Sequence, residues 1–512
     1  MMMSKRKTTV WILGDQLLNH HPAVQLAQDD GDDFRIVLVE NWNRARRLSY
    51  HRKKIVLIFS AMRHYAELLR ERGYTLDYLQ TDSLRDALLN HTREHQPDRI
   101  LTMAASEYRG RQFQQTTLGR VLHVPVDMLP NTQFLIGQYN PNPDPDPDKQ
   151  YIMETFYRAM RRHFDILIEP DGKPTGGAWN FDKENRKPLP KRGFELPTIE
   201  GFSPDSMTQS VMEAVETEAH GLGTAEGFAY AVTHEEAEAA LHEFISTRLD
   251  RFGPYEDAMS AEHRTLFHSV LSTYLNIGLL EPMQMIRAAE SAYHKGDVPI
   301  NSAEGFIRQV LGWREYMAWQ YWNQMPALAE SNDWDAQRTL PDFFWDGQTD
   351  MRCLQHIVTG LLQTGYAHHI ERLMVLSNFF MLTGIEPQTA VEWFSAMFID
   401  AYDWVMQPNV IGMGLNADGG KIATKPYIAS ANYIHKMSNY CGDCRYNHRE
   451  RHGEDACPFN YLYWNFLINH EERLRANPRS GPAVLGLRHL DYQERRAVQQ
   501  QANVFLSKLQ TS

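Results

Sequence analysis

The chain has 512 residues, of which 43% are hydrophobic, and its formal net charge is -12. This length allows two or three domains with substantial cores, and no apolar run approaches the ~20 residues that a membrane-spanning helix needs. Because the chain starts without a charged-then-apolar signal segment and has only four cysteines, we expect a soluble, cytoplasmic protein of a reducing compartment and not a disulfide framework.

The negative charge is concentrated in one part of the chain. Residues 204–262 contain thirteen Asp and Glu against two Arg, which accounts for -11 of the -12. Residues 149–195 contain ten Lys and Arg against seven acids, and residues 420–500 contain twelve against eight. A local patch that faces phosphates is therefore permitted, although ordinary solvated faces explain these charges equally well.

Residues 1–135 alternate between strand and helix patterns. Short apolar segments typical of buried strands lie at Thr9–Leu13, Phe34–Val39, Tyr74–Leu79, Arg99–Met103 and Val124–Met128. Between them, helical spacing of apolar residues marks Ser60–Arg72 and Ser83–His95. Such crossovers predict an α/β domain with a doubly wound, mainly parallel, Rossmann-like sheet. No G-x-G-x-x-G fingerprint follows the first strand, but Gly14-Asp15-Gln16 does, at the edge where open sheets bind ligands.

Residues 136–225 are predicted to be a linker. The proline-rich segment Pro141–Pro147 excludes regular structure, and residues 170–205 are rich in Gly, Pro, Lys and Asn. From Glu226 onward nearly every segment has helical spacing. We therefore expect a large all-helical domain over residues 226–512.

The helical half contains several segments that could carry chemistry. Ser269 and Ser272 lie near a predicted helix start, where hydroxyls and free backbone N–H groups can hold a diphosphate; simple N-capping is the alternative. His368 and His369 are adjacent imidazoles, which titrate near neutrality and can offer a proton, although a structural role is also possible. Arg372 would form a buried ion pair with Asp400 if their segments meet.

Tryptophans gather in the same half of the chain. Five of them, within 33 residues, are Trp313, Trp319, Trp322, Trp334 and Trp345. Packing explains most aromatic clusters. Near a redox centre, however, closely spaced indoles can carry an electron, and Trp393 and Trp404 extend the supply.

Three of the four cysteines form the pattern Cys441-Gly-Asp-Cys444-x12-Cys457-Pro458, and Cys353 lies upstream. Four thiolates can hold one [4Fe–4S] cluster or close a tetrahedral Zn²⁺ site. A single Cys-x2-Cys pair, a proline after a ligand and a distant fourth cysteine favour the cluster. Zinc and unligated buried thiols remain the alternatives.

The order of these motifs resembles the flavin domain of the photolyase/cryptochrome superfamily. The motifs are Tyr255, His268-Ser269-x-Leu271-Ser272-x-Tyr274-Leu275, Gly312-Trp313-Arg314-Glu315-Tyr316, His368-His369-x-x-Arg372 and Asp400-Ala-Tyr402. With the four cysteines, the chain is similar to the bacterial iron–sulfur branch, whose described members include prokaryotic (6-4) photolyases. The resemblance covers essentially the whole chain, including Gly14-Asp15-Gln16-Leu17 and the linker segment Trp179–Arg186.

The resemblance implies three bound groups. A U-shaped FAD in the helical domain would contact Tyr255, His268, Ser269, Leu271, Ser272, Trp313, Arg314, Arg372, Asp400 and Tyr402. A [4Fe–4S] cluster would be held by Cys353, Cys441, Cys444 and Cys457. A 6,7-dimethyl-8-ribityllumazine antenna would lie near Gly14, Asp15, Gln16 and Glu40. This chain has Arg44 where the family would supply a further acidic antenna contact.

The implied activity is repair of pyrimidine (6-4) photoproducts under blue light. Reduced flavin would pass an electron to a lesion flipped out of single- or double-stranded DNA. His369 would donate a proton, His368 would orient it, and Trp393 and Trp345 would photoreduce the flavin. We expect a monomer in the bacterial cytosol, associated with the nucleoid when bound to DNA. The alternatives are a cryptochrome-like photoreceptor and a cluster-bearing structural protein that binds nucleic acid without a flavin.

Overall fold

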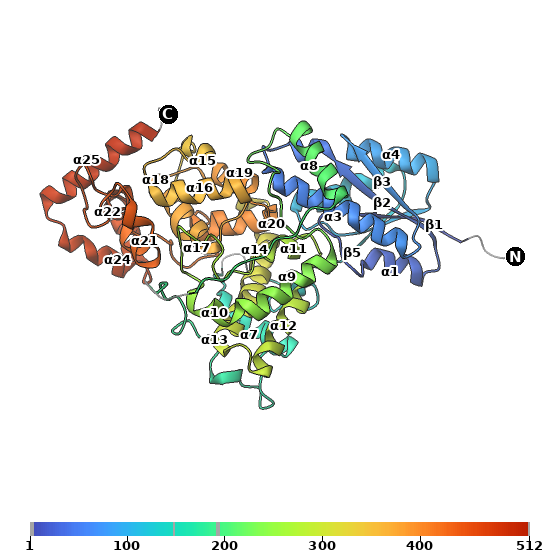
Figure 1. Ribbon diagram of the computed structural model, residues 1–512, viewed down its shortest axis with the longest axis horizontal. Helices are drawn as coiled ribbons and strands as arrows, with labels where there is room; N and C mark the ends of the chain where they lie inside the picture. Colours follow the sequence, from blue (N-terminus) through green and yellow to red (C-terminus); the bar gives the residue numbers. More distant parts are fainter. Residues whose placement is uncertain (1–4, 147–148, 191–194, 510–512) are drawn as a thin grey trace.

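The computed structural model describes residues 5–146, 149–190 and 195–509. Figure 1 shows an α/β domain at one end of the molecule, a central helical body, and a group of C-terminal helices at the other end. This arrangement agrees with the predicted order of an α/β domain followed by an all-helical one. Residues 141–146 contain no helix or strand, as expected, and Pro147 lies outside the described residues.

The N-terminal domain is built on a five-stranded parallel sheet with the order β3-β2-β1-β4-β5. The strands are β1 Lys7–Ile12, β2 Asp33–Asn41, β3 Leu76–Thr81, β4 Arg99–Met103 and β5 Val126–Leu129. Each overlaps a predicted strand, so the doubly wound sheet is confirmed. The strand order reverses beside β1, which places residues 13–16 at the switch point of the sheet.

Helices cover both faces of this sheet. One face packs against α1 (Pro22–Asp29) and α3 (Arg52–Glu71), and the other against α4 (Leu84–His95) and α6 (Gly119–Leu122). Successive residues of β1 face opposite layers, with Val10 and Ile12 in one core and Trp11 in the other. Both faces are therefore dry, as a parallel sheet requires.

The predicted linker contains two helices. α7 (Met153–Phe164) packs against residues 308–314 of the helical domain, and α8 (Ser206–Glu218) packs along α3. Between them, the described part of residues 165–205 has one short 3-10 turn, Thr175–Gly177, and no longer helix. The surface connector is thus shorter than the predicted linker, whose boundaries stay a prediction.

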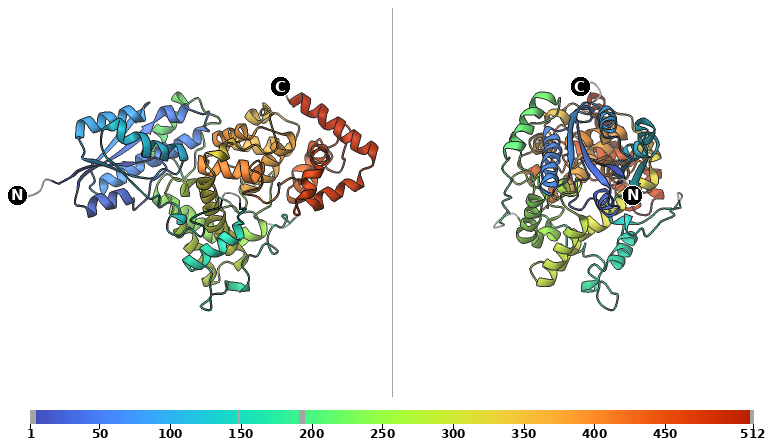
Figure 2. Two further views of the ribbon diagram at one scale, coloured as in Figure 1. Left: turned by 180° about the vertical axis from the view of Figure 1, so that it is seen from behind. Right: turned by 90° about the vertical axis from the view of Figure 1, so that its right-hand side faces the viewer.

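The remainder of the chain is helical. The central body contains α9 His234–Thr247, α10 Leu249–Tyr255, α11 Ser272–Leu275, α12 Pro282–Lys295, α13 Ile300–Ile307, α14 Glu315–Gln324, α15 Phe343–Asp346, α16 Arg352–Thr364, α17 His369–Glu371, α18 Asn378–Thr383, α19 Pro387–Met397 and α20 Asp403–Met406. The C-terminal group contains α21 Ala431–Met437, α22 Pro458–Asn469, α23 Glu471–Ala476, α24 Gly481–Leu485 and α25 Tyr492–Leu509. Figure 2 shows this group and the sheet at opposite ends of the molecule.

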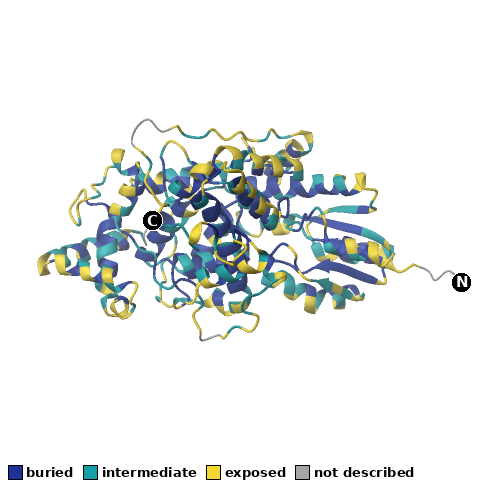
Figure 3. Cartoon of the chain, turned by 90° about the horizontal axis from the view of Figure 1, so that it is seen from below, coloured by how far each residue is buried: buried dark blue, intermediate teal, exposed yellow. Residues whose placement is uncertain are grey.

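Burial is greatest in the sheet and in the central helical body, while the outer helices carry exposed faces (Figure 3). In the described ranges of the chain, every helix is too short or too polar to cross a lipid bilayer.

Candidate functional site

Arg372 and Asp400 form the expected ion pair inside the helical domain. The Arg372 guanidinium atoms Nη1 and Nη2 lie 3.0 and 3.1 Å from the two Asp400 carboxylate oxygens. Ser272 Oγ donates to Asp400 Oδ2 over 2.7 Å, and Asn276 Nδ2 donates to the Asp400 backbone carbonyl over 2.9 Å. Since Asp400 is buried, removal of either charge would leave the other in a poorly solvated environment.

The predicted diphosphate segment is placed by the same network. α11 is a four-residue helix whose N-cap position is Leu271, which has no polar side chain, and the Ser272 hydroxyl bonds to Asp400. Ser269 Oγ accepts a hydrogen bond from the Leu271 backbone N–H, and Leu271 itself is buried. The N-capping alternative therefore does not describe Ser272. Tyr255, at the end of α10, lies with its ring 5.6 Å from Phe267.

Three imidazoles are gathered beside this pair. The His368 ring stacks on His268 at 4.1 Å between centroids and 9° between planes, and the His369 centroid lies 5.4 Å from His268. His268 is fixed by the backbone carbonyls of Glu256 and Thr265, at 2.7 and 2.9 Å from its two ring nitrogens. Burial lowers the pKa of His268 to about 4 and that of His368 well below its ordinary value. Both rings are therefore neutral near pH 7, and the single N–H of His268 donates to one of the two carbonyls while its other nitrogen only contacts the second.

His369 differs from its two neighbours because its side chain is 48% exposed. Its Nε2 lies 3.6 Å from Asp257 Oδ1. Burial alone would raise the pKa of Asp257, but the hydrogen bond and charge of His369 hold this pKa below its usual value. Asp257 is thus a carboxylate that stabilises the protonated imidazole. The sequence did not single out Asp257, although it follows Tyr255 by two residues.

Two buried polar groups near this cluster have no hydrogen-bond partner among the described residues. Both ring nitrogens of His368 are orphaned, and Glu371 Oε2 lies 3.7 Å from one of them. Both carboxylate oxygens of Glu256 are orphaned too, and Arg186 Nε lies 3.5 Å from one. Buried groups of this kind are costly unless a partner or ligand satisfies them.

Trp313 and Arg314 lie on a π-helical turn, Arg308–Arg314, of the type that often marks functional sites. Arg314 is buried, pairs with Glu315 Oε1 over 2.6 Å, and lies over the Phe134 ring at 4.5 Å. It therefore contacts the end of the α/β domain. The Trp313 ring lies 6.3 Å from Tyr316. The contacts of these two side chains are separate from the Arg372–Asp400 pair, so their flavin role stays a prediction.

Trp393 lies in a row of aromatic rings that begins beside Arg372. Its buried ring lies 6.1 Å from Phe398 and 5.4 Å from Phe344, and its Nε1 donates to the Phe344 carbonyl over 3.0 Å. The guanidinium of Arg372 lies 4.1 Å over the Phe398 ring. Trp345, the next residue after Phe344, is 39% exposed. Trp393 therefore belongs to the row of ring contacts that leads to Arg372, whereas Trp345 is placed near it only as the neighbour of Phe344, and its electron-transfer role stays a prediction.

All four cysteines line one cavity between α16, α21 and α22. Its other lining residues include Met351, Tyr440, Tyr446 and Phe459. Burial and the neighbouring thiols raise the pKa of Cys441 to about 11 and that of Cys457 to about 12. In the described part of the chain, two groups bring three metal-ligating atoms within 4.8 Å of one another, and neither contains a cysteine. The four thiols therefore face one common site, at which a metal group could bind all of them.

A cavity of about 400 Å³ lies between the α/β domain and the helical domain. Gly14, Asp15 and Arg44 line it from one side, and Tyr402 lines it from the other. Burial, followed by the charge of Glu107, raises the pKa of Asp15 to about 6. The cavity therefore combines an apolar wall with a few convergent polar groups, as ligand sites commonly do.

Two of the residues predicted for an antenna have other contacts. Gln16 is buried and donates to the backbone carbonyl of Ala104 over 3.0 Å. Glu40 receives two hydrogen bonds from Arg63, at 3.0 and 2.9 Å, and one from the Tyr78 hydroxyl at 2.6 Å. Neither is among the lining residues of the interdomain cavity. Lys54, Arg44 and Glu107, which the sequence did not predict as binding residues, are among its charged lining residues, together with the predicted Asp15.

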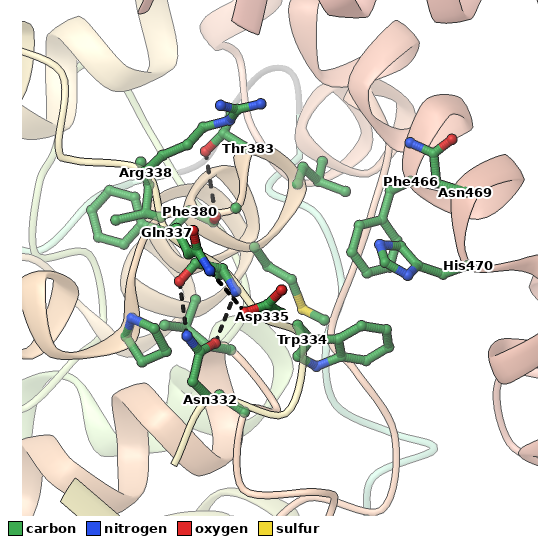
Figure 4. A pocket seen from close by; sticks show the side chains of 18 of the residues that line it. Asn332, Trp334, Asp335, Gln337, Arg338, Phe380, Thr383, Phe466, Asn469 and His470 are labelled. Carbon is green, nitrogen blue, oxygen red and sulfur yellow. Dashed lines mark hydrogen bonds between the residues drawn. The ribbon is translucent and has the colours of Figure 1, made fainter. Parts of the chain in front are cut away.

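A further cavity of about 480 Å³ separates the central body from α22 and α25 (Figure 4). Trp334 lies in its wall, donates to the Asn416 carbonyl over 2.9 Å, and packs under the Arg473 guanidinium at 3.6 Å. His470 packs against the Trp334 ring at 5.0 Å. For Trp334, therefore, the packing interpretation of the tryptophan cluster is sufficient.

Comparison with known proteins gives matches over the whole chain. Residues 10–230 match the family described as Deoxyribodipyrimidine photo-lyase-related protein. The (6-4) photolyase of Agrobacterium fabrum is 41% identical over 510 residues, which cover 98% of this chain and 99% of that protein. A class III photolyase of Agrobacterium tumefaciens has the same fold, with a TM-score of 0.59, 15% identity and 99% of both chains covered. A Synechocystis cryptochrome has a TM-score of 0.60, with 14% identity over 85% of this chain and 87% of its own.

Proposed function

Because the chain belongs to the photolyase/cryptochrome family, as a full-length relative of a (6-4) photolyase, we propose that it repairs pyrimidine (6-4) photoproducts in UV-damaged DNA under blue light. The observation that carries this proposal is the half-exposed His369, held beside Asp257 and above two neutral, stacked imidazoles. A proton donor that reaches solvent beside a buried ion pair is suited to a substrate entering from outside.

The buried polar groups fit FAD as the cofactor. The Arg372–Asp400 pair offers a fixed charge pair, and the orphaned nitrogens of His368 offer unsatisfied donors or acceptors. Tyr255, His268, Ser269, Leu271 and Ser272 would surround the diphosphate side. When bound and reduced, FAD would supply a light-excited electron to the lesion. The role of Trp313, Arg314 and Tyr402 at the flavin is part of the same proposal.

The residues of the chain would then handle the proton. His369 Nε2 would carry it and give it to the lesion, while the Asp257 carboxylate keeps the imidazolium stable until transfer. His368 is stacked on His268, and its ring centroid lies 6.2 Å from that of His369. It would hold the position of His369 without titrating. The damaged nucleotide would have to be flipped out of the stack to reach this face.

For the metal site, we propose a [4Fe–4S] cluster held by Cys353, Cys441, Cys444 and Cys457. The single Cys-x2-Cys pair, the proline after Cys457 and the distant Cys353 favour the cluster over a tetrahedral zinc ion. A positive iron centre would also reverse the raised thiol pKa values. About four iron atoms per chain by metal analysis would support this assignment.

The interdomain cavity is our candidate for the lumazine antenna. Its volume of about 400 Å³ and its apolar walls suit a small ring system, with Gly14, Asp15 and Arg44 as polar contacts. Glu40, on β2, and Gln16, in the segment after β1, would support the cavity from behind its lining residues. We also place the protein in the cytosol as a monomer that binds single- or double-stranded damaged DNA.

The decisive experiment is an illuminated repair assay on oligonucleotides that carry one (6-4) lesion, in both strand forms. His369→Gln should lower the repair rate by about 10²- to 10⁴-fold, the usual contribution of a positioned acid, while its flavin absorbance equals that of the wild type. His163→Gln, a histidine stacked on Tyr139 in the linker region, is the matched control and should repair normally.

The same assay separates the alternatives. Wild-type protein that binds flavin and bleaches under light, yet leaves the lesion intact, would point to a cryptochrome-like photoreceptor. Protein that purifies without flavin absorbance would point to a structural nucleic-acid-binding role. Full repair by His369→Gln would remove His369 from the reaction.

A further inference from the structure

Three side chains of the α/β domain bring metal-ligating atoms together. Asp77 comes from β3, and His91 and His95 come from the last two turns of α4. The histidines are four residues apart, so they share one face of the helix, and their ring centroids are 4.6 Å apart. Asp77 Oδ2 lies 3.1 Å from His91 Nδ1 and 3.1 Å from His95 Nε2. One atom from each residue lies within 4.8 Å of the other two.

An ordinary His–Asp contact uses one ring nitrogen, whereas here two ring nitrogens face the same carboxylate oxygen. Asp77 Oδ2 is buried and has no hydrogen-bond partner among the described residues, although both ring nitrogens are at 3.1 Å. A tetrahedral ion with bonds of about 2.0–2.1 Å holds its nitrogen and oxygen ligands roughly 3.3 Å apart. The observed 3.1 Å between Asp77 Oδ2 and each ring nitrogen is close to that spacing, so one bound ion could replace the protons between them.

The surrounding groups orient the three ligands. Arg35 Nη1 donates to Asp77 Oδ1 over 2.8 Å, which leaves Oδ2 for another partner. Thr9 Oγ1 lies 2.9 Å from His91 Nε2. With the proton on Nε2 donated to Thr9, the lone pair of His91 is on Nδ1, the atom that faces Asp77. Support of this kind behind each ligand is characteristic of protein metal sites.

The cluster is accessible at one side and distant from the proposed repair chemistry. The His91 side chain is 2% exposed, whereas Asp77 and His95 are 22% and 25% exposed. Glu94 Oε1 lies 4.0 Å from His95 Nε2 and can approach from solvent. Thr9 and Arg35 are paired near the starts of β1 and β2, whereas Gly14 follows the end of β1. The three ligands therefore lie near the amino ends of the parallel strands, and the interdomain cavity lies at their carboxyl ends.

We propose that Asp77, His91 and His95 bind one divalent first-row transition-metal ion of the zinc class, with water or Glu94 as the fourth ligand. Two imidazoles and one carboxylate are a ligand set that suits such ions and leaves a position open. The ion links β3 to α4, so its binding stabilises the α/β domain by an amount that grows with the logarithm of its concentration over its Kd. This site is independent of the flavin site, the proposed [4Fe–4S] cluster and the repair reaction.

The test is a Zn²⁺ titration of the purified holoprotein by calorimetry, with His95→Gln as the variant. Wild-type protein should bind one Zn²⁺ with a Kd below about 10 µM, and His95→Gln should bind at least about 100-fold more weakly. His20→Gln, an exposed histidine outside the cluster, and His369→Gln, from the other imidazole group, should bind as the wild type does.

Two results would overturn the proposal. One is equal Zn²⁺ affinity in wild type and His95→Gln; the other is loss of the site in His369→Gln alone, which would assign the ion to the helical domain. If His95→Gln fails to fold, Thr9→Val decides, since it keeps all three ligands and removes only the contact to His91. It should weaken binding about 10-fold or more, and unchanged affinity would reject the site.

Discussion

The two domains each gather imidazoles, and the groups differ in what lies between the rings. In the α/β domain, the Asp77 carboxylate lies 3.1 Å from both His91 and His95. In the helical domain, His368 stacks on His268 at 4.1 Å, and the nearest carboxylate to its ring is 3.7 Å away. A carboxylate at ligand distance suits a cation, whereas stacked rings without one stay neutral and act by position.

The difference teaches that the residue type alone does not define a histidine site. In the first group, the Thr9 hydroxyl contacts His91 and the Arg35 guanidinium contacts Asp77. These contacts orient the imidazole and the carboxylate toward each other. Backbone carbonyls hold His268 in the second group, so that the exposed ring of His369 is the one free to exchange a proton. Three predictions test this distinction.

The largest effect is expected from Asp400→Asn. It removes one partner of the buried pair with Arg372, which should cost about 3–5 kcal/mol of unfolding free energy, and it should release bound flavin. The matched change in the other group, Asp77→Asn, breaks a pair with the more exposed Arg35 and should cost about 1 kcal/mol or less. Denaturant unfolding of both variants in metal-free buffer measures the contrast; equal losses would contradict it.

Acid should destabilise the protein through the helical group. The pKa of His268 is lowered by burial to about 4, so between pH 6.5 and 4 the unfolded chain binds a proton that the folded chain does not. The contribution of His268 to the free energy of unfolding is therefore complete above pH 6.5 and is lost as the pH falls toward 4. The loss should be on the order of 2 kcal/mol. Thermal unfolding from pH 7.5 to 4.5 measures it, and an unchanged melting temperature would contradict it.

The smallest effect is expected from Asp257→Asn, which removes the charge beside His369 but keeps its shape. The His369 ring loses the charged partner 3.6 Å from its Nε2, a half-exposed contact worth about 1 kcal/mol or less, so the repair rate should fall by about fivefold or less. Asp250→Asn, a half-exposed acid on α10, is the control. Equal repair rates in both variants, measured at one pH, would mean that Asp257 does not support the proton donor.

The sequence predicted local features better than tertiary contacts. All five strands were visible as short apolar runs because a buried parallel strand must be apolar on both faces. The Arg372–Asp400 pair and the meeting of four cysteines were also anticipated from their motifs. The Asp77–His91–His95 group was not, since two histidines on a helix and an aspartate on a strand carry no local signal until the chain folds them together.

Partners of single polar residues were equally invisible in the sequence. Glu40 was expected at an antenna, and its strand was located correctly. The guanidinium that binds it belongs to Arg63 on α3, and the hydroxyl belongs to Tyr78 on β3. Asp257 was overlooked because an acid within the most negative stretch of the chain, residues 204–262, reads as one more solvated charge.

The start of α3 fastens one domain to the other. The His51 backbone N–H donates to the Ala396 carbonyl over 2.7 Å, and Lys54 Nζ donates to the carbonyls of Ser395 and Ala401 over 3.1 and 2.6 Å. These hydrogen bonds join the two domains at the interdomain cavity, whose wall contains residues of both domains. A fragment that ends at residue 135 would contain all five strands but would lack the side of the interdomain cavity that the helical domain supplies. A molecule bound in that cavity therefore reports whether the two domains are docked.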